Sequence, residues 1–195
     1  MRQSIINRNT FETNIELKIE LDGKGQANVQ SGVGFMDHML TLFSFHSGFD
    51  LYIRCEGDTM VDDHHSVEDI GIALGKAILE ALGDRAGIAR YGQFLLPMDE
   101  ALVLCALDIS GRSHLNFDVQ VPSAKVGNFD TELVKEFFLA VCRNLNLTLH
   151  FKQLAGENAH HIIEAMFKGF GKAMKLAVAI DANMAGRVPS SKGTL

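Results

Sequence analysis

Two stretches of the chain carry the same chemically suggestive pattern, two adjacent histidines followed by a glutamate. The pattern HHxxE occurs at His64–Glu68 and again at His160–Glu164. On a helix, a glutamate four residues after one histidine and three after the next lies on their side of the cylinder. Imidazole and carboxylate together suit Mn, Fe, Co or Zn better than Ca or Mg. The pattern therefore predicts a metal site.

A single copy of this pattern has a simpler interpretation, a solvated helix start. Asp62 or Asp63 could cap the helix, and Glu68 could merely support its dipole. Two copies favour metal binding, because capping does not require adjacent histidines twice. Neighbouring helical residues point about 100° apart. We therefore expect the two histidines of each copy to serve different metal ions, in two sites related by the repeat.

Neither site is complete from one helix, so further ligands are expected from elsewhere. His38 is the candidate in the first half, 26 residues before His64. In the second half, Glu136 lies 24 residues before His160 and so occupies a similar place.

Basic and hydroxyl side chains form a second group of interest. Arg90, Arg112, Lys168 and the segment Ser190–Lys192 have the chemistry to cradle a phosphate, because arginine offers paired donors and lysine a point charge. The segment lacks a glycine-rich loop and leads no helix, so it is not a Walker motif.

The elements that must position these residues follow a repeated order. Six letters of His64–Ile78 recur in register in His160–Met174 (His, His, Glu, Gly, Lys and Ala), which indicates a duplication. Hydrophobic spacing predicts strands over 14–23, 25–30, 49–58, 101–110, 113–121 and 146–153, and helices over 35–48, 64–83, 131–145 and 160–180.

This order predicts an α+β fold of two β-β-α-β-α halves, with helices packed on one face of mixed sheets. We expect a single catalytic domain over residues 1–195, made of repeats at about 1–90 and 91–185. The tail, residues 186–195, is expected to bind substrate.

Composition limits the class of protein. Hydrophobic residues make up 47% of the chain, and the net charge is −6 with no basic run, which argues against nucleic acid as a partner. No apolar run approaches the length of a membrane span, and the first residues lack the apolar region of a signal peptide. The three cysteines sit among apolar neighbours and share no metal-ligand spacing. We expect reduced, buried thiols in a cytoplasmic protein.

Seven stretches together resemble one family. They are GFMDHMLTLFSFHSGFDL, DDHHSVEDIGIALG, GIARYG, DISGRSHLNF, FDTELVKEFF, LTLHFKQLAGENAHHIIEAMFKGFGKAM and PSSKGTL. In order and spacing they are similar to imidazoleglycerol-phosphate dehydratase of histidine biosynthesis, over essentially the whole chain. No phosphatase half accompanies them, so the resemblance is to the monofunctional form.

The resemblance implies a fold like ribosomal protein S5 domain 2, two Mn²⁺ ions per active site and a homo-oligomer of 24 subunits with interfacial sites. The implied metal ligands are His38, His64, His65, Glu68, Glu136, His160, His161 and Glu164. Many members carry histidine where this chain has Glu136, and glutamate can also ligate Mn²⁺. The implied substrate contacts are Glu12, His38, His46, His65, Arg90, Arg112, His160, Lys168, Ser190, Ser191 and Lys192.

The implied reaction is the dehydration of D-erythro-imidazole glycerol phosphate to imidazole acetol phosphate. The proton to be removed is barely acidic, and a metal-bound imidazolate lets the ring expel the hydroxyl through a diazafulvene-type intermediate. Glu12 and Glu68 are the acid/base candidates. Two other classes remain open: a dinuclear hydrolase of phosphate esters, and a metal-storage or metal-assembled structural oligomer.

Overall fold

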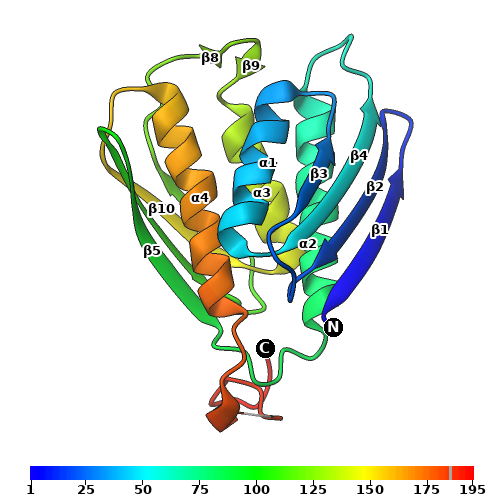
Figure 1. Cartoon of the computed structure of the whole chain (residues 1–195), viewed down its shortest axis with the longest axis vertical. Helices are drawn as coiled ribbons and strands as arrows, with labels where there is room; N and C mark the ends of the chain where they lie inside the picture. The colour runs from blue at the N-terminus through cyan, green and yellow to red at the C-terminus, as the bar shows by residue number, and fades with distance from the viewer. Residues whose placement is uncertain (185) are drawn as a thin grey trace.

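The computed structural model describes residues 1–184 and 186–195. Two four-stranded sheets flank four α-helices, which lie between them (Figure 1). The helices of each half cover one face of their own sheet, and the two helix layers meet at the centre of the molecule. The α+β class predicted from the sequence is confirmed.

The first half contains four strands and two helices, in the sheet order β1-β2-β4-β3. Strands β1, β2 and β4 pair antiparallel, and β3 is parallel to β4. The elements are β1 (Gln3–Asn9), β2 (Thr13–Glu20), β3 (Ala27–Gln30), α1 (Gly34–Ser47), β4 (Asp50–Gly57) and α2 (His64–Leu82).

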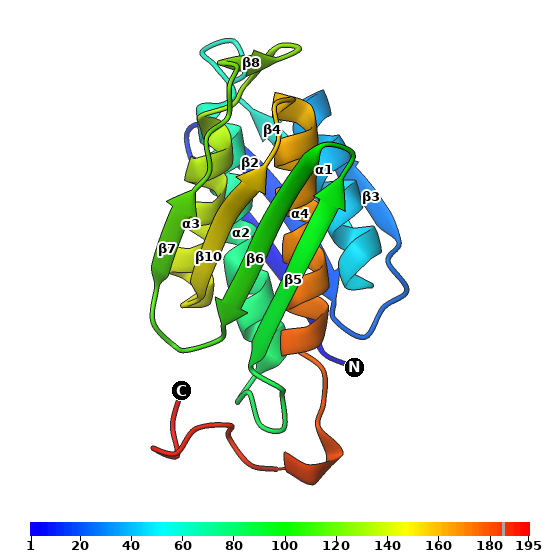
Figure 2. The ribbon, with the colours of Figure 1, turned by 90° about the vertical axis from the view of Figure 1, so that its left-hand side faces the viewer.

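The second half repeats this arrangement, in the sheet order β5-β6-β10-β7 (Figure 2). Its elements are β5 (Tyr91–Met98), β6 (Ala101–Asp108), β7 (His114–Asp118), α3 (Leu133–Leu145), β10 (Thr148–Ala155) and α4 (Ala159–Ala177). A small hairpin of β8 (Lys125–Val126) and β9 (Phe129–Asp130) precedes α3, and a short 3₁₀ helix, η1 (Ala182–Met184), begins the tail. The predicted end of the second repeat, at about 185, falls outside the described residues.

Each half begins with one strand more than the predicted β-β-α-β-α unit. Strand β1 presents Ser4 and Arg8 on its inner side, so its alternation is not one of apolar residues. Strand β5 contains Gly92 and Pro97. Proline removes a hydrogen-bond donor from a sheet, and the edge position of β5 tolerates this loss. Both strands therefore lack the pattern by which strands are recognised.

The helices pair in parallel, α2 with α3 and α1 with α4. In α2, Gly71 faces Phe137 and Ala140 of α3, and Gly75 faces Val141 and Asn144 one turn later. In α4, Gly171 faces the α1 backbone at Phe43 and Ser47. The missing side chains let the helix backbones approach closely. Since both pairs run parallel, the N-terminal ends within each pair lie side by side.

Aromatic side chains fill the space between the two helix layers and the sheets. Phe43 stacks on Phe170 with ring centroids 5.2 Å apart, and Phe137 stacks on Phe167 at 5.3 Å. The three cysteines are free and buried, as predicted. Burial raises the pKa of the Cys142 thiol to about 12. No helix among the described residues is long and apolar enough to cross a membrane.

The contact at Gly75 makes a prediction about stability. Alanine normally favours a helix over glycine by about 1 kcal/mol. Here an added Cβ would lie 2.8 Å from the Val141 carbonyl oxygen and 2.9 Å from Asn144 Cβ. Because a helix carbonyl cannot move aside, we expect Gly75→Ala to lower the melting temperature by about 5 °C. Gly34→Ala, where nothing lies within 4 Å, is the control and should leave the melting temperature unchanged or raise it.

Candidate active site at the helix N-termini

The first turns of α1 and α4 bring three potential ligands together. His160 Nε2 lies 3.1 Å from Glu164 Oε2, and His38 Nε2 lies 3.4 Å from the same oxygen. The three ligand atoms all lie within 4.8 Å of one another. Glu164 is buried, whereas His38 is exposed and His160 half-buried. The cluster is thus an open-sided group of two imidazoles and one carboxylate, a donor set that fits a transition-metal ion.

Neighbouring side chains hold this cluster in place. Asn158 caps α4 by accepting hydrogen bonds from the backbone amides of His160 and His161. The ring of Phe35 packs edge-on against His160, with centroids 5.2 Å apart. Lys168 Nζ lies 2.5 Å from Glu164 Oε1. Burial by itself would raise the pKa of Glu164, but hydrogen bonds from Lys168, His38 and His160 outweigh it, and the pKa is lowered. Glu164 is therefore held as a carboxylate.

The repeat of this cluster at α2 is less complete. His64 Nε2 lies 3.7 Å from Glu68 Oε2, the same pairing as His160 with Glu164. Glu136 lies half-buried in the first turn of α3. The helix contacts show which residues of α3 and α1 correspond in the repeat. Gly75 of α2 contacts Val141 and Asn144 of α3, and the equivalent Gly171 of α4 contacts Phe43 and His46 of α1. A residue of α3 therefore corresponds to the α1 residue 98 positions earlier.

That shift makes Glu136 the structural counterpart of His38, as the sequence spacing predicted. Within the described residues, however, His38, His160 and Glu164 are the only three ligands that gather closely enough for one ion. One chain by itself therefore closes one cluster and leaves its repeat open.

The second histidine of each pair turns away from these clusters toward acidic loops. His65 Nδ1 lies 3.0 Å from Asp58 Oδ2, and its Nε2 lies 3.7 Å from Glu12 Oε1. His161 Nδ1 lies 2.7 Å from Glu100 Oε2, and its Nε2 lies 3.8 Å from Asp99 Oδ2. The adjacent histidines do face different directions. Sequence reasoning missed Asp58, Asp99 and Glu100, because nothing in their local pattern links them to histidines on a helix.

These pairings shift the titration of their members. A hydrogen bond to Asp58 raises the pKa of His65, and one to Glu100 raises the pKa of His161. The hydrogen bond from His161, followed by that from the Asn158 backbone amide, lowers the pKa of Glu100 to about 2.

A buried polar network fixes the β1–β2 hairpin that carries Glu12. Asp69 is buried on α2, where it accepts a hydrogen bond from Thr13 Oγ1 at 2.5 Å and an ion pair from Arg8 at 2.7 Å. Both partners flank the hairpin. The hydrogen bond from the Asp58 amide to the Glu12 carbonyl oxygen ties the hairpin to the loop before α2. Glu12 is exposed, but its backbone is well anchored.

A cavity of about 550 Å³ lies between the N-terminal ends of α1 and α2, below the β8–β9 hairpin. His38, Asp63 and Phe129 are among the residues that line it. Burial first, and then the carboxylates of Asp130 and Asp62, raise the pKa of Asp63. The cavity adjoins the metal-ligand cluster through His38 and is large enough for a small organic molecule.

The predicted phosphate-binding residues lie mostly at the other end of the molecule. The Arg90 amide donates to the Ala177 carbonyl oxygen at the last turn of α4, about 25 Å along the helix from His160. Arg90 and residues of the tail, among them Ser190, Ser191 and the unpredicted Arg187, line a cavity of about 500 Å³. Arg112 and Lys192 are exposed, and Gly111, next to Arg112, lies close to Leu195 of the tail.

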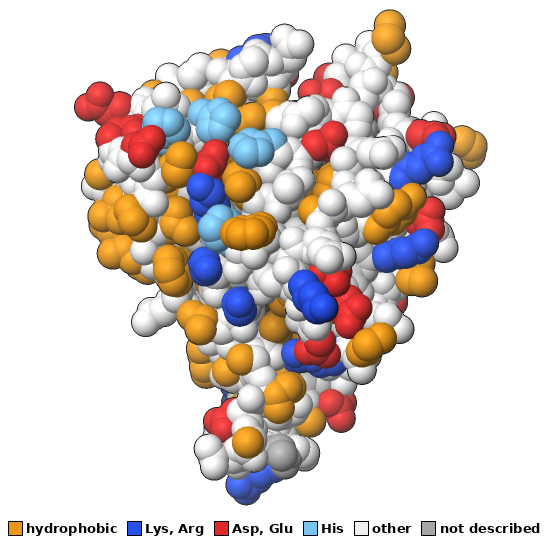
Figure 3. All heavy atoms as spheres, viewed as in Figure 1, with side chains coloured by type: hydrophobic (Ala, Val, Ile, Leu, Met, Phe, Trp, Pro, Cys, Tyr) orange, Lys and Arg blue, Asp and Glu red, His pale blue; other side chains and the backbone are white. Residues whose placement is uncertain are grey.

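His46 and Lys168 lie between these two ends, near the middle of the helix pair. Figure 3 shows histidines gathered where α4 begins, with acidic side chains beside them and basic side chains following below along the helix. Burial, and then the charges of Lys172 and Lys168, lower the pKa of His46. Lys168, Lys172 and Lys175 thus give α4 a run of positive charges, although the net charge of the chain is −6.

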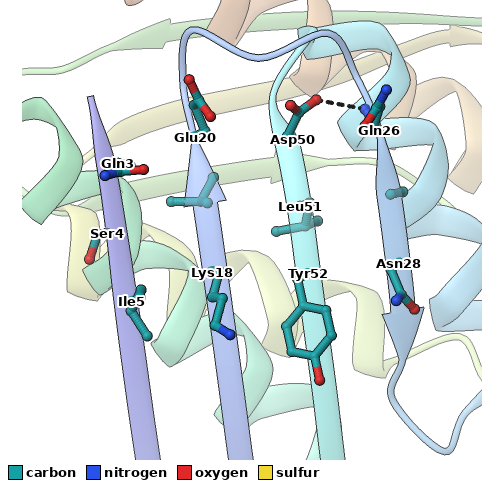
Figure 4. A pocket seen from close by; sticks show the side chains of 12 residues that line it. Gln3, Ser4, Ile5, Lys18, Glu20, Gln26, Asn28, Asp50, Leu51 and Tyr52 are labelled. Atoms are coloured by element: carbon teal, nitrogen blue, oxygen red, sulfur yellow. Dashed lines mark hydrogen bonds between the residues drawn. The ribbon is translucent and has the colours of Figure 1, made fainter. Parts of the chain in front are cut away.

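A further hollow, of about 410 Å³, lies on the outer face of the first sheet (Figure 4). It is lined by the strands β1, β2, β4 and β3, with Lys18 beside Tyr52 and Asp50 bonded to the Gln26 amide. The four helices separate it from the second sheet, and none of the predicted site residues lines it. It is therefore not part of the candidate site.

Comparison with known proteins agrees with this geometry. A family model described as imidazoleglycerol-phosphate dehydratase matches residues 31–174. A protein of that name from Prochlorococcus marinus (strain NATL1A) is 54% identical over 194 residues, which cover 100% of this chain and 96% of the relative.

Two solved structures share the fold. The crystal structure of imidazoleglycerol-phosphate dehydratase from Staphylococcus aureus superposes with a TM-score of 0.84 at 44% identity, covering 92% of this chain and 99% of that one. The crystal structure of IGPD from Pyrococcus furiosus gives a TM-score of 0.82 at 41% identity, covering 97% and 100%.

The Glu100–His161 pair predicts a pH-dependent stability for the metal-free protein. The lowered pKa of Glu100 gives stability that is present above 4.5 and lost as the pH falls toward about 2. The raised pKa of His161 gives stability that is present below 6.5 and lost as the pH rises through the raised value. In EDTA-treated protein, Glu100→Gln should therefore lower the melting temperature most between pH 4.5 and 6.5, where both contributions are present. The effect should be smaller at lower and at higher pH. A difference that is constant with pH would contradict this, and Glu157→Gln is the control.

Proposed function

This chain belongs to the imidazoleglycerol-phosphate dehydratase family and is a hydro-lyase of histidine biosynthesis, and from that premise we propose that its turnover depends on two Mn²⁺ ions per active site. The substrate is D-erythro-imidazole glycerol phosphate and the product imidazole acetol phosphate. The observation that carries the proposal is the convergence of His38, His160 and Glu164 on a common point.

The residues of this cluster fit a divalent transition metal. Two neutral imidazole nitrogens and one carboxylate oxygen match the ligands that Mn²⁺, Fe²⁺, Co²⁺ or Zn²⁺ accept, and the open side leaves room for a substrate atom. The ion would act as a Lewis acid toward the substrate's imidazole. His38, His160 and Glu164 would hold one ion, and His64, Glu68 and Glu136 are the corresponding set for the second.

The outward-facing His65 and His161 supply the remaining nitrogens in this proposal. Each points away from the cluster on its own helix, so each is available to an ion held by a neighbouring copy of the chain. Exposed apolar residues around the start of α2 support such a contact. Phe11 in the β1–β2 hairpin and Met60 and Val61 in the loop before α2 are all exposed. A surface of this kind favours burial against another subunit.

Two glutamates are the candidates for proton transfer in this proposal. Glu12 stands at the tip of an anchored hairpin, with Oε1 3.7 Å from His65 Nε2. Glu68 lies one turn along α2 from His64. We assign Glu12 and Glu68 to the removal of the proton from the carbon attached to the imidazole ring and to its delivery during ketonisation.

The basic residues of the tail region bind the phosphate in this proposal. Arg90 uses three of its five donors within the chain, two on Asp108 and one on the Pro189 carbonyl oxygen. Two donors remain for a phosphate, and Arg112, Ser190, Ser191 and Lys192 add exposed or half-buried donors nearby. In this proposal Lys168 and His46, near the middle of the helix pair, contact the substrate on the side of the metal ligands.

The separation of the two groups supports an active site that is shared between chains. About 25 Å of helix lies between His160 and the Arg90 region. A substrate with only a short carbon chain between its imidazole and its phosphate cannot span that distance. We propose a homo-oligomer, with 24 subunits as the family resemblance implies, in which the tail region of one copy faces the helix N-termini of another. The cytoplasmic location and the lack of nucleic-acid and membrane partners stay predictions.

A turnover assay on imidazole glycerol phosphate tests the metal dependence. Protein stripped with EDTA should be inactive, and Mn²⁺ should restore formation of the keto product. Glu12→Gln should bind the ion normally but lose about 100-fold or more in turnover, because only proton transfer is affected. Full activity in stripped protein would refute the proposal. Release of inorganic phosphate would favour a hydrolase instead, and metal binding without any turnover a structural oligomer.

Mixing two inactive variants tests whether the site is shared between copies. His160→Ala disables the helix N-termini, and Lys192→Ala disables the tail. Each homo-oligomer should have little activity. Hybrids formed by co-expression should recover about a quarter of wild-type activity if each site takes one end from each of two copies. If hybrids that are shown to contain both variants recovered no activity, each site would be built within one chain.

A further inference from the structure

The two outward-facing histidines share a feature that duplication of the chain does not explain. Each presents its Nδ1 to a carboxylate, His65 to Asp58 at 3.0 Å and His161 to Glu100 at 2.7 Å. A carboxylate only accepts hydrogen bonds, so the hydrogen in each contact is on Nδ1. In the neutral ring this leaves Nε2 without a hydrogen and free to bind an ion.

The carboxylates come from loops that are not equivalent in the repeat. Asp58 follows β4, in a loop of six residues, 58–63. The equivalent loop after β10 has only three residues, 156–158, and begins with Gly156 at a φ of 132°. That loop supplies no carboxylate to His161, and the β5–β6 hairpin supplies Glu100 instead. In both halves, Nδ1 of the second histidine of the pair thus contacts a carboxylate, but the carboxylate comes from a different loop in each half.

The carboxylate of Glu100 and the backbone of Asp58 are themselves held in position. The second oxygen of Glu100 accepts hydrogen bonds from the backbone amides of Glu157 and Asn158, at 3.2 and 2.8 Å. The amide of Asp58 donates to the Glu12 carbonyl oxygen, and its carbonyl oxygen accepts from Val61. An anchored acceptor restricts both the tautomer and the rotation of the imidazole it contacts.

We propose that Asp58 and Glu100 are positioning residues, which fix His65 and His161 in the Nδ1–H tautomer with Nε2 aimed outward at the ion. The proposal rests on the metal dependence proposed above. It assigns to two residues outside the ligand set a share of the protein's metal affinity. Asp99 and Glu12, which lie nearer to Nε2, have no part in this role.

Metal affinity, measured apart from turnover, tests the proposal. Chelator competition with Mn²⁺ on the intact oligomer should show that Glu100→Ala and Asp58→Ala each weaken binding by about 10- to 100-fold at the affected site. Glu100→Gln should recover part of the loss, because its amide oxygen can still accept from Nδ1. With Co²⁺ as the probe, the visible absorption of Glu100→Ala should differ from that of the wild type, since one nitrogen ligand is misplaced.

A control variant separates ring positioning from charge. Glu157→Gln removes a neighbouring acidic group that touches no histidine ring, and should bind Mn²⁺ like the wild type. An equal loss of affinity in Glu157→Gln and in Glu100→Ala would overturn the proposal.

His161→Ala distinguishes this proposal from the one on which it depends. The positioning role would be overturned if His161→Ala weakened Mn²⁺ binding while Glu100→Ala and Asp58→Ala left it unchanged. That result would leave the proposed metal site intact. Unchanged binding in His161→Ala would instead remove His161 from the ligand set, and the positioning role of Glu100 with it.

Discussion

The close parallel packing of two helix pairs is the constraint on which the rest of the structure depends. Glycines at 71, 75 and 171 let the backbones of α2 and α4 touch those of α3 and α1. Parallel packing puts the first turns of paired helices together, and the histidines and glutamates are in those turns. Side chains of ordinary size at these glycines would separate the helices and hence the ligand atoms, which converge within 4.8 Å.

The same packing explains the acidic surroundings of the site. A helix N-terminus carries partial positive charge, and paired parallel helices add theirs at one end. Glu164, Asp58 and Glu100 lie at these ends and offset that charge. Hydrogen bonds to Asp58 and Glu100 raise the pKa values of His65 and His161.

Duplication produced two similar halves but not two identical sites. Strand order, helix order and the HHxxE pattern are common to both. The loops that support the histidines differ, six residues in one half and three in the other. Glu136 stands where the first half has His38, so a carboxylate replaces an imidazole at that position of the repeat. The tail region occurs in one half only, so the histidine–glutamate groups lie at one end of the molecule and Arg90 with the tail at the other.

The sequence by itself determined the α+β class, the four long helices and the histidine–glutamate groups, because each depends on spacing within a single helix or strand. It did not reveal β1 and β5, whose inward positions include Ser4 and Arg8 or whose run contains Pro97. Nor did it reveal Asp58 and Glu100, because their contacts to histidines join segments 7 and 61 residues apart. Only the tertiary structure decided that His38 meets Glu164 and that Arg90 lies at the far end of α4. Contacts between distant segments depend on how helices pack on one another, and local patterns carry no record of that packing.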